Sequence, residues 1–537
     1  MSVPATRPPA GAWDCVVVGG GHNGLVCAAY LAHAGRSVLV LEAAERLGGT
    51  AATREFAPGF RVSAGPQFLH LMPAALRAEL RLEAHGLKYA ATAVATVALA
   101  ADGPALPIAG PAGSAHEPAA LAALAARSAS DAEAWPEFRL RLDRFAATLA
   151  PLIEGTPPRL GGEAWSDRLA LLRLGWQIRR LGRRDMRELL RIIGMNVYDL
   201  LEEHFETPLL KGALGFDAVL GANFGPRSPG TVLTQLYRLA GESRAGRDGA
   251  IQVSGGIGAL SEALAGAARA AGATIRVGAK VARIAVRADR ASGIVLESGE
   301  QIGALTVVSS ADPKATFLRL LGAEHLDTGF VRRLSHLRTR GLAAKLHLAL
   351  DRAPAFIGLD AGRLASRLLI APSLAYLEQA YDHSKYGECS SAPALEISVP
   401  TVADPGLAPA GRHVLSAIVQ YVPYALAGGW GEGRQRCMDL AIDTLERHAP
   451  GLRASIIAAE LLAPPDIERE FGVTGGHWHH ADLALDQFYM VRPVPGATQY
   501  GTPLAGLYLC GAGCHPGGGV MGIAGRNAAR RILAEAA

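Results

Sequence analysis

The stretch VVVGGGHNGLVCAAYLA, residues 16–32, decides the fold of this chain. An apolar run from Cys15 to Val18 ends in GGGHNG (Gly19 to Gly24), and a helical pattern follows from Leu25 to Ala34. The turn has the spacing G-x-G-x-x-G, in which successive glycines permit a tight turn, close approach of the backbone to a pyrophosphate, and packing of the helix on the strand. The helix N-terminus adds free N–H groups for the phosphates. We therefore predict a strand, a phosphate-binding turn and a helix.

The residues after this helix extend the same pattern. A second apolar run, Val38 to Leu41, ends at Glu42, 18 residues after Gly24, where an acidic residue is expected to bind ribose hydroxyls. RLGGT follows at residues 46–50; its glycines let the backbone lie close to a ligand and its arginine can neutralise phosphate, although alone it would be a simple turn. We expect a dinucleotide to bind at Gly19, Gly21, His22, Asn23, Gly24, Glu42, Ala43, Arg46, Gly48, Gly49 and Thr50.

A second glycine-rich loop lies near the C-terminus, in the segment from Gly506 to Leu533. A strand over Leu507 to Cys510 leads into this loop, and we expect a helix to start near Gly519 or Val520. Because glycine has no side chain, a glycine-rich loop lets a planar ring lie directly against the backbone. A glycine-rich hairpin or a helix-packing segment is the alternative, but the density of glycines before a helix favours a ring-binding loop.

Apolar periodicity along the rest of the chain predicts an α/β protein with more than one domain. Long helical patterns occupy 117–203, a second α/β stretch occupies 255–311, and strands are expected at 345–350 and 413–419. We predict a Rossmann-type domain, a doubly wound parallel sheet built from three separated segments, and a second, mixed α+β substrate domain with a helical insertion. The predicted segments are 12–90, 245–320 and 485–537 for the first domain, and 91–244 and 321–484 for the second.

Composition excludes several classes of protein. Half of the 537 residues are hydrophobic and 19% are charged, which indicates a large core rather than disorder. A net charge of +4 over this length does not indicate nucleic-acid binding. Six irregularly spaced cysteines argue against a secreted disulfide framework, and residues 1–13 lack the apolar run of a signal peptide. We expect a cytoplasmic protein without a transmembrane span; no pattern indicates an oligomeric state.

Several motifs resemble one known family. GGGHNGL, the Glu42 to Gly49 extension and the terminal CGAGCHPGGGVMG resemble the phytoene-desaturase-like, or carotenoid/retinoid, FAD oxidoreductases. Four further stretches resemble one branch of that family, the branch of pyridine nucleotide-disulfide oxidoreductase domain-containing protein 2. They are PGFRVSAGPQFLH (58–70), SGGIGALSEAL (254–264), PPDIEREFGVTGGHWHH (464–480) and LDQFYMVRPVPG (485–496). The resemblance covers nearly the whole chain, with its motifs in the same order.

The resemblance implies FAD as the cofactor and a second domain that covers the flavin. It places Val281 near the adenine, and it places Gly511, Gly513, Gly518, Gly519 and Val520 near the flavin ring and ribityl chain. Despite the name of the branch, neither a redox cysteine pair nor a second nucleotide fingerprint is evident. Cys510 and Cys514 are better interpreted as small buried side chains.

Histidines cluster in HWHH at 477–480, close to Asp482. A flavin enzyme does not require a metal there, and we predict no metal site. The resemblance places His480 on the substrate side of the flavin, where it would relay a proton. A hydrogen-bonded loop histidine is an equally good interpretation.

Residues 168–191 form a basic segment in which arginines alternate with leucines and Trp176. A basic amphipathic helix can lie on an anionic membrane and admit a lipophilic substrate, whereas such a run is more often a solvated face with local ion pairs. The sequence therefore leaves peripheral membrane contact as an open hypothesis.

Three functions are compatible with these features. The first is FAD-dependent dehydrogenation of a C–C bond in an apolar or lipid-like small molecule. The second is oxidation of a C–N bond by an enzyme of amine-oxidase type, which would favour an aromatic cage at the flavin. The third is a flavoprotein whose main role is to bind or regulate a partner.

Overall fold

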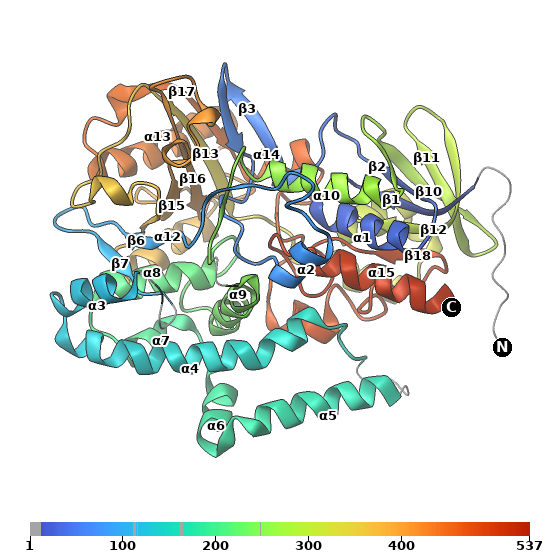
Figure 1. Ribbon diagram of the computed structural model, residues 1–537, viewed down its shortest axis with the longest axis horizontal. Helices are drawn as coiled ribbons and strands as arrows, with labels where there is room; N and C mark the ends of the chain where they lie inside the picture. Colours follow the sequence, from blue (N-terminus) through green and yellow to red (C-terminus); the bar gives the residue numbers. More distant parts are fainter. Residues whose placement is uncertain (1–11, 111–113, 115, 160–164, 247–248, 537) are drawn as a thin grey trace.

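The computed structural model describes residues 12–110, 114, 116–159, 165–246 and 249–536 (Figure 1). The N-terminal residues 1–11, in which the sequence predicts no signal peptide, lie outside this part of the chain. Two seven-stranded sheets organise the molecule, one on each side of Figure 1, with a layer of helices beneath them.

The first sheet confirms the predicted Rossmann-type fold. The glycine-rich turn joins β1 (Trp13–Val18) to α1 (His22–His33), which leads to the parallel strand β2 (Val38–Leu41). Parallel pairing continues to β9 (Thr274–Arg276), β12 (Gln301–Ser309) and β18 (Leu507–Leu509). The helices α10 (Gly258–Ala270) and α15 (Ile523–Ala536) pack against α1.

An antiparallel hairpin extends the first sheet beyond the predicted parallel strands. It consists of β10 (Val281–Arg287) and β11 (Arg290–Leu296), and β11 pairs with β12. Ala288 and Asp289 form the two-residue turn, with φ of 46° and 55°. Positive φ at both positions is the geometry that joins twisted antiparallel strands.

The second sheet has one apolar face and one polar face. Its order is β17-β13-β16-β15-β14-β6-β7, and all neighbours are antiparallel except β14 and β6. The apolar face packs on α13 (Gly431–His448). Because side chains alternate along a strand, the other face carries Lys345, His347, Arg367, Glu396, Ser398, Ser416 and Gln420. The strands are β17 (Ile456–Leu462), β13 (Ala343–Leu350), β16 (His413–Gln420), β15 (Leu395–Ser398), β14 (Arg367–Ile370), β6 (Thr96–Ala98) and β7 (Leu106–Ile108).

The helical prediction for 117–203 is confirmed in its described part. α4 (Ala129–Glu154) runs along the base of the helical layer, and α5 (Trp165–Arg180) and α6 (Gly182–Ile192) lie outside it (Figure 1). The remaining helices are α2 (Ala74–Glu79), α3 (Glu117–Ala125), α7 (Val197–Glu202), α8 (Pro208–Val219), α9 (Thr231–Ala245), α11 (Thr328–Ser335), α12 (Leu374–Lys385) and α14 (Pro464–Phe471). Two small hairpins pair β3 (Thr53–Ala57) with β4 (Phe60–Ser63) and β5 (Tyr89–Ala91) with β8 (Gln252–Val253).

The last helix begins later than the sequence predicts. The predicted start was Gly519 or Val520, but α15 starts at Ile523. Gly519 and Gly522 have φ of 109° and 73°, and a right-handed helix cannot include such residues. Residues 517–522 therefore form a loop rather than the first helical turn.

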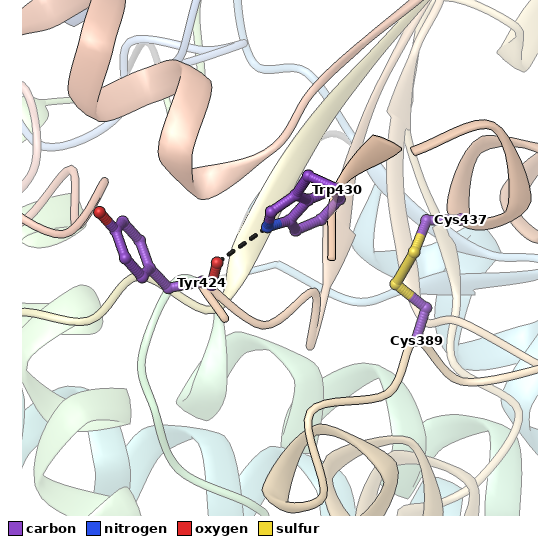
Figure 2. Close-up of a disulfide and its surroundings, with 4 residues drawn as sticks. All are labelled: Cys389, Tyr424, Trp430 and Cys437. Atoms are coloured by element: carbon purple, nitrogen blue, oxygen red, sulfur yellow. Dashed lines mark hydrogen bonds between the residues drawn. A yellow bond between two sulfur atoms is a disulfide. The ribbon is translucent and has the colours of Figure 1, made fainter. Parts of the chain in front are cut away.

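One disulfide joins Cys389 to Cys437 of α13, with the Cα atoms 5.9 Å apart (Figure 2). Nearby, the indole of Trp430 donates a hydrogen bond to the carbonyl oxygen of Tyr424 (2.9 Å). The other four cysteines are free and buried. The irregular spacing of the cysteines did not predict this bridge, because the bridge depends on contacts between segments that are distant in sequence. None of the described helices is long and apolar enough to cross a membrane.

Candidate cofactor and substrate site

A cavity of about 990 Å³ extends from the carboxyl edge of the first sheet to the polar face of the second. Val18, Leu41 and Ser310, which lie at or directly after the ends of three parallel strands, line its first part. Ligands bind at this edge in open α/β sheets because loops and helix N-termini converge there. The opposite wall includes Ile418 and Glu396 of the second sheet.

Backbone geometry at the glycine turn suits a pyrophosphate. α1 has no side-chain cap and no acidic residue in its first turn, so its N-terminal N–H groups remain available to an anion. Glu42 accepts a hydrogen bond from Gly20 N–H (2.7 Å) and thereby holds the turn against β2. A Cβ on Gly24 would lie 2.2 Å from the Gly19 carbonyl oxygen, so only glycine lets α1 pack here. The site fits a dinucleotide.

Most of the sequence-predicted residues line this cavity. Its wall includes Gly19, Gly21, His22, Asn23, Glu42, Ala43, Arg46, Gly48, Gly49, Thr50, Val281, Gly518, Gly519, Val520 and His480. Gly24, Gly511 and Gly513 do not belong to the wall. Instead, a Cβ on Gly511 would lie 2.4 Å from the Ser310 carbonyl oxygen, and one on Gly513 would lie 2.4 Å from Pro313 Cδ. These two glycines permit close packing of the loop on the residues that follow β12.

Arg492 holds the loops at the centre of the site, a role that sequence reasoning missed. Within the described part of the chain, its fully buried guanidinium donates only to backbone carbonyls: Asp482 at 2.9 Å, Gln487 at 3.1 Å, His479 at 2.8 Å, Ala481 at 3.3 Å, Ala512 at 3.0 Å and Cys514 at 3.3 Å. One side chain thus ties the HWHH segment to the C-terminal glycine loop. The LDQFYMVRPVPG motif contains this arginine, but nothing in its spacing indicates the convergence.

Four histidines line the cavity wall, and all four are neutral at physiological pH. Burial is the main cause that lowers the pKa of His22, His70 and His480 to about 4 each, and that of His479 to about 3. His480 has a left-handed backbone (φ 62°), and among the described residues its Nδ1 has no hydrogen-bond partner. Such a ring can accept a proton but is a weak base, because its pKa lies well below 7.

The other polar residues of the HWHH segment have structural partners. His477 Nε2 lies 2.9 Å from Asp482 Oδ1, and both side chains are buried. No group of three or more His, Cys, Asp or Glu side chains in the described part of the chain could hold a metal. His515 Nε2 lies 2.9 Å from the Leu152 carbonyl oxygen, and this histidine does not line the cavity.

Cys510 and Cys514 are fully buried free thiols, as predicted. Burial raises the pKa of Cys514. A thiol held in this state is not a nucleophile.

A buried network of charges lines the far end of the cavity. Arg367 of β14 donates through Nε to Glu396 Oε2 (2.6 Å) and through Nη2 to Asp217 Oδ1 (2.6 Å). Arg238 of α9 lies 3.5 Å from the same Asp217 oxygen. We call Asp217, Arg238, Arg367 and Glu396 the charge cluster; all four residues line the cavity. The sequence did not indicate it, because its members come from four separate elements.

Comparisons with known proteins agree with this geometry. The family model for flavin-containing amine oxidoreductases matches residues 24–533. Pyridine nucleotide-disulfide oxidoreductase domain-containing protein 2 of Rattus norvegicus is 36% identical, over 97% of this chain and 94% of that protein. A phytoene desaturase (lycopene-forming) of Paracoccus sp. is 26% identical over 62% of this chain and 63% of the relative.

Among solved structures, putrescine oxidase bound to putrescine has the same fold, with a TM-score of 0.59 and 15% identity, over 97% of this chain and 99% of that one. The matched family requires flavin, and the cavity walls fit FAD. The chain therefore belongs to the flavin-containing amine oxidoreductase family, in a phytoene-desaturase-like branch, and is an FAD-dependent oxidoreductase.

Proposed function

We propose that this enzyme dehydrogenates a C–C bond of a small lipid-like molecule. The observation that carries the proposal is the set of apolar side chains in the wall of the cavity. Its wall contains Phe68, Leu71, Leu220, Ile418 and Leu483. An apolar chain bound there loses contact with water, which favours binding by roughly 25 cal/mol per Å² of buried surface.

The chain's own residues would position the substrate and receive a proton. Bound FAD would supply the acceptor for a hydride that leaves one substrate carbon with its electron pair. The neighbouring carbon then loses a proton as the double bond forms. We propose that His480 accepts this proton on its ring, which is neutral and lies at the cavity wall. Gly518 and Gly519 lie at the cavity wall, and a Cβ there would meet His479 and Leu71, so these glycines let the loop pack against both side chains.

Oxidation of a C–N bond is the second candidate, favoured by the family and by the putrescine oxidase fold. An aromatic cage at the flavin would support it. Phe68, Tyr237, Phe471 and Trp478 line the cavity, but among the described residues no two of these rings contact each other. The apolar residues of the wall therefore favour C–C dehydrogenation over amine oxidation.

An anaerobic substrate panel tests the proposal. The FAD-loaded enzyme is mixed with long-chain ketones, terpenoids and amines, and flavin bleaching is followed together with product mass. We expect bleaching by a lipid-like compound and a product that has lost two hydrogens. Bleaching by amines alone, with aldehyde products, would establish the second candidate instead. A photoreduced flavin that oxygen, quinones and the whole panel leave reduced would support a regulatory or partner-binding role.

Peripheral membrane contact through residues 168–191 is a further part of the proposal. On α5, Trp165, Leu169, Leu172 and Trp176 follow helical spacing along one face and are exposed, Trp165 by 74%. Residues 165–192 contain eight arginines and three acidic residues, a net charge of +5 in a chain of +4. We propose that this surface binds an anionic bilayer, from which a lipid-like substrate would enter.

A further inference from the structure

Carboxylates already neutralise both arginines of the charge cluster. Arg367 pairs with Asp217 and Glu396, and Arg238 pairs with Asp217 and with Glu242, its neighbour one turn along α9 (3.0 Å). Burial alone would raise the pKa of Asp217 and Glu396, but the arginines hold both below the ordinary values. Gln67 donates to Glu396 through its amide (3.1 Å), which fixes that carboxylate further. Because three carboxylates surround these two arginines, the site needs no anionic ligand.

One hydrogen-bond donor of the cluster remains unused. Arg367 is 2% exposed, and its Nη1 is buried without a hydrogen-bond partner in the described part of the chain. Nε and Nη2 of the same guanidinium are both occupied by carboxylates. A buried donor without an acceptor is unfavourable, because it has lost its hydrogen bonds to water and gained none in return. Because Arg367 lines the cavity, a ligand in the cavity is the natural source of the missing acceptor.

We propose that Arg367 of the charge cluster binds an uncharged oxygen group, a carbonyl or a hydroxyl, at one end of an otherwise apolar substrate. This inference rests on the proposed function and specifies its substrate class. A carbonyl or hydroxyl oxygen supplies the acceptor without changing the charge balance. A carboxylate would add a further buried negative charge beside arginines that are already paired, which is costly to desolvate. A plain hydrocarbon would leave Nη1 unsatisfied.

Anchoring one end of the substrate also selects the bond that reacts. The cluster lies on the second sheet and on α8 and α9, whereas the glycine loops belong to the first sheet, and one cavity joins them. An apolar chain held by its oxygen at the cluster would present carbons at a set distance from that oxygen to the flavin side. The enzyme would therefore oxidise one position along the chain.

Equilibrium binding tests the proposal without turnover. The oxidised, FAD-loaded protein is titrated with a long-chain methyl ketone and with the alkane and carboxylate of equal chain length, and the flavin absorbance and thermal unfolding are recorded. We expect the ketone to bind at least tenfold more tightly than either of the others, which corresponds to about 1.4 kcal/mol. Equal affinity for ketone and alkane, or tightest binding of the carboxylate, would overturn the proposal.

Two matched variants assign this preference to Arg367. Arg367→Lys keeps the charge but lacks the forked donors, so we expect the ketone to lose its advantage over the alkane. Arg434→Lys is the control, because Arg434 also pairs with a buried carboxylate, Asp466, but does not line the cavity. If Arg367→Lys does not fold, the ligand series on the unmodified enzyme still decides. A ketone preference without any dehydrogenation product would contradict the proposed function and leave this inference standing.

Discussion

Two glycines of the N-terminal turn have different tasks, and substitution separates them. A Cβ on Gly21 has its nearest protein neighbour 3.8 Å away, at Ser310 Oγ, and the φ of Gly21 is −69°, which alanine adopts easily. A Cβ on Gly24 would clash with the Gly19 carbonyl oxygen at 2.2 Å. The first position has room that only a ligand would use, whereas the second is filled by the protein itself.

We therefore predict that Gly21→Ala keeps the thermal stability of the FAD-free protein but weakens FAD binding at least tenfold, about 1.4 kcal/mol. Gly24→Ala, as the comparison variant, should lower both stability and FAD content, because the helix must move off the strand. Flavin absorbance per protein and thermal unfolding of the FAD-free forms measure the two effects. Normal FAD affinity in Gly21→Ala would argue against phosphate at this glycine.

Lys345 is a second residue with a definite pH signature. It is fully buried on β13, its Nζ has no partner among the described residues, and burial lowers its pKa to about 7. Between pH 7 and about 10.4, the ordinary lysine pKa, the unfolded chain holds a proton on this group that the folded chain has released. Stability from this group therefore rises with pH across that range.

Lys345→Met should raise the free energy of unfolding at pH 7 by several kcal/mol, since each unit of pKa shift corresponds to about 1.4 kcal/mol. The same variant should lack the rise in stability between pH 7 and 10. Denaturant unfolding at several pH values measures both. Lys280→Met is the control, since Lys280 forms an exposed ion pair with Glu297 and should change stability by less than about 0.5 kcal/mol. An unchanged pH profile in Lys345→Met would show that this lysine is charged in the folded state.

At the scale of elements, α5 combines an exposed apolar stripe with flanking arginines. Arg168 lies over the Trp165 ring (5.5 Å) and Arg180 over the Trp176 ring (4.5 Å), so cations accompany both tryptophans. Asp167, at the start of α5, accepts a hydrogen bond from Gln499 (3.1 Å), which attaches the helix to the body. An anionic bilayer would bury the stripe and attract the arginines, each by about 1 kcal/mol.

We predict that the protein sediments with vesicles containing phosphatidylserine and that replacing Trp165, Leu172 and Trp176 by serine reduces binding at least tenfold. High salt should also release the protein, because the arginine contribution is screened. Tyr386→Ser is the control, because Tyr386 is also an exposed aromatic residue (79%) but lies at the end of α12, outside the proposed membrane-binding surface. Equal sedimentation with uncharged vesicles would be incompatible with the proposed surface.

At the scale of the whole molecule, the cavity walls come from both sheets, so the cofactor should couple their stabilities. A ligand that binds only the folded state stabilises it by about 2.7 kcal/mol at a free concentration of 100 Kd. We predict one cooperative thermal transition for the FAD-loaded protein. After FAD is removed, the transition should occur at a lower temperature and become broader or split in two. Mock reloading without FAD should leave it in that state. Calorimetry with FAD restored provides the control. A transition temperature independent of FAD would contradict this coupling.

The sequence by itself determined the cofactor unit of this protein. The turn at Gly19 to Gly24, the strand before it, and Glu42 after it lie within one continuous stretch, and local spacing sets their geometry. The predicted strands β1 and β2 are confirmed within two residues, and the turn and Glu42 both line the cavity. The start of α15 was placed too early, since the residue type glycine does not reveal which glycines take positive φ.

Only the tertiary structure decided what faces the cofactor unit. Arg492 donates to the carbonyls of residues 479, 481, 482, 487, 512 and 514. Arg367 binds Asp217 and Glu396, so three separate elements meet there. The disulfide between Cys389 and Cys437 likewise joins residues 48 positions apart. Such contacts depend on how whole sheets and helices pack, and packing is a property of many distant residues at once. The glycine turn could be predicted from the sequence because its geometry depends on residues that are neighbours in the chain. The substrate wall could not, because it depends on packing between distant residues.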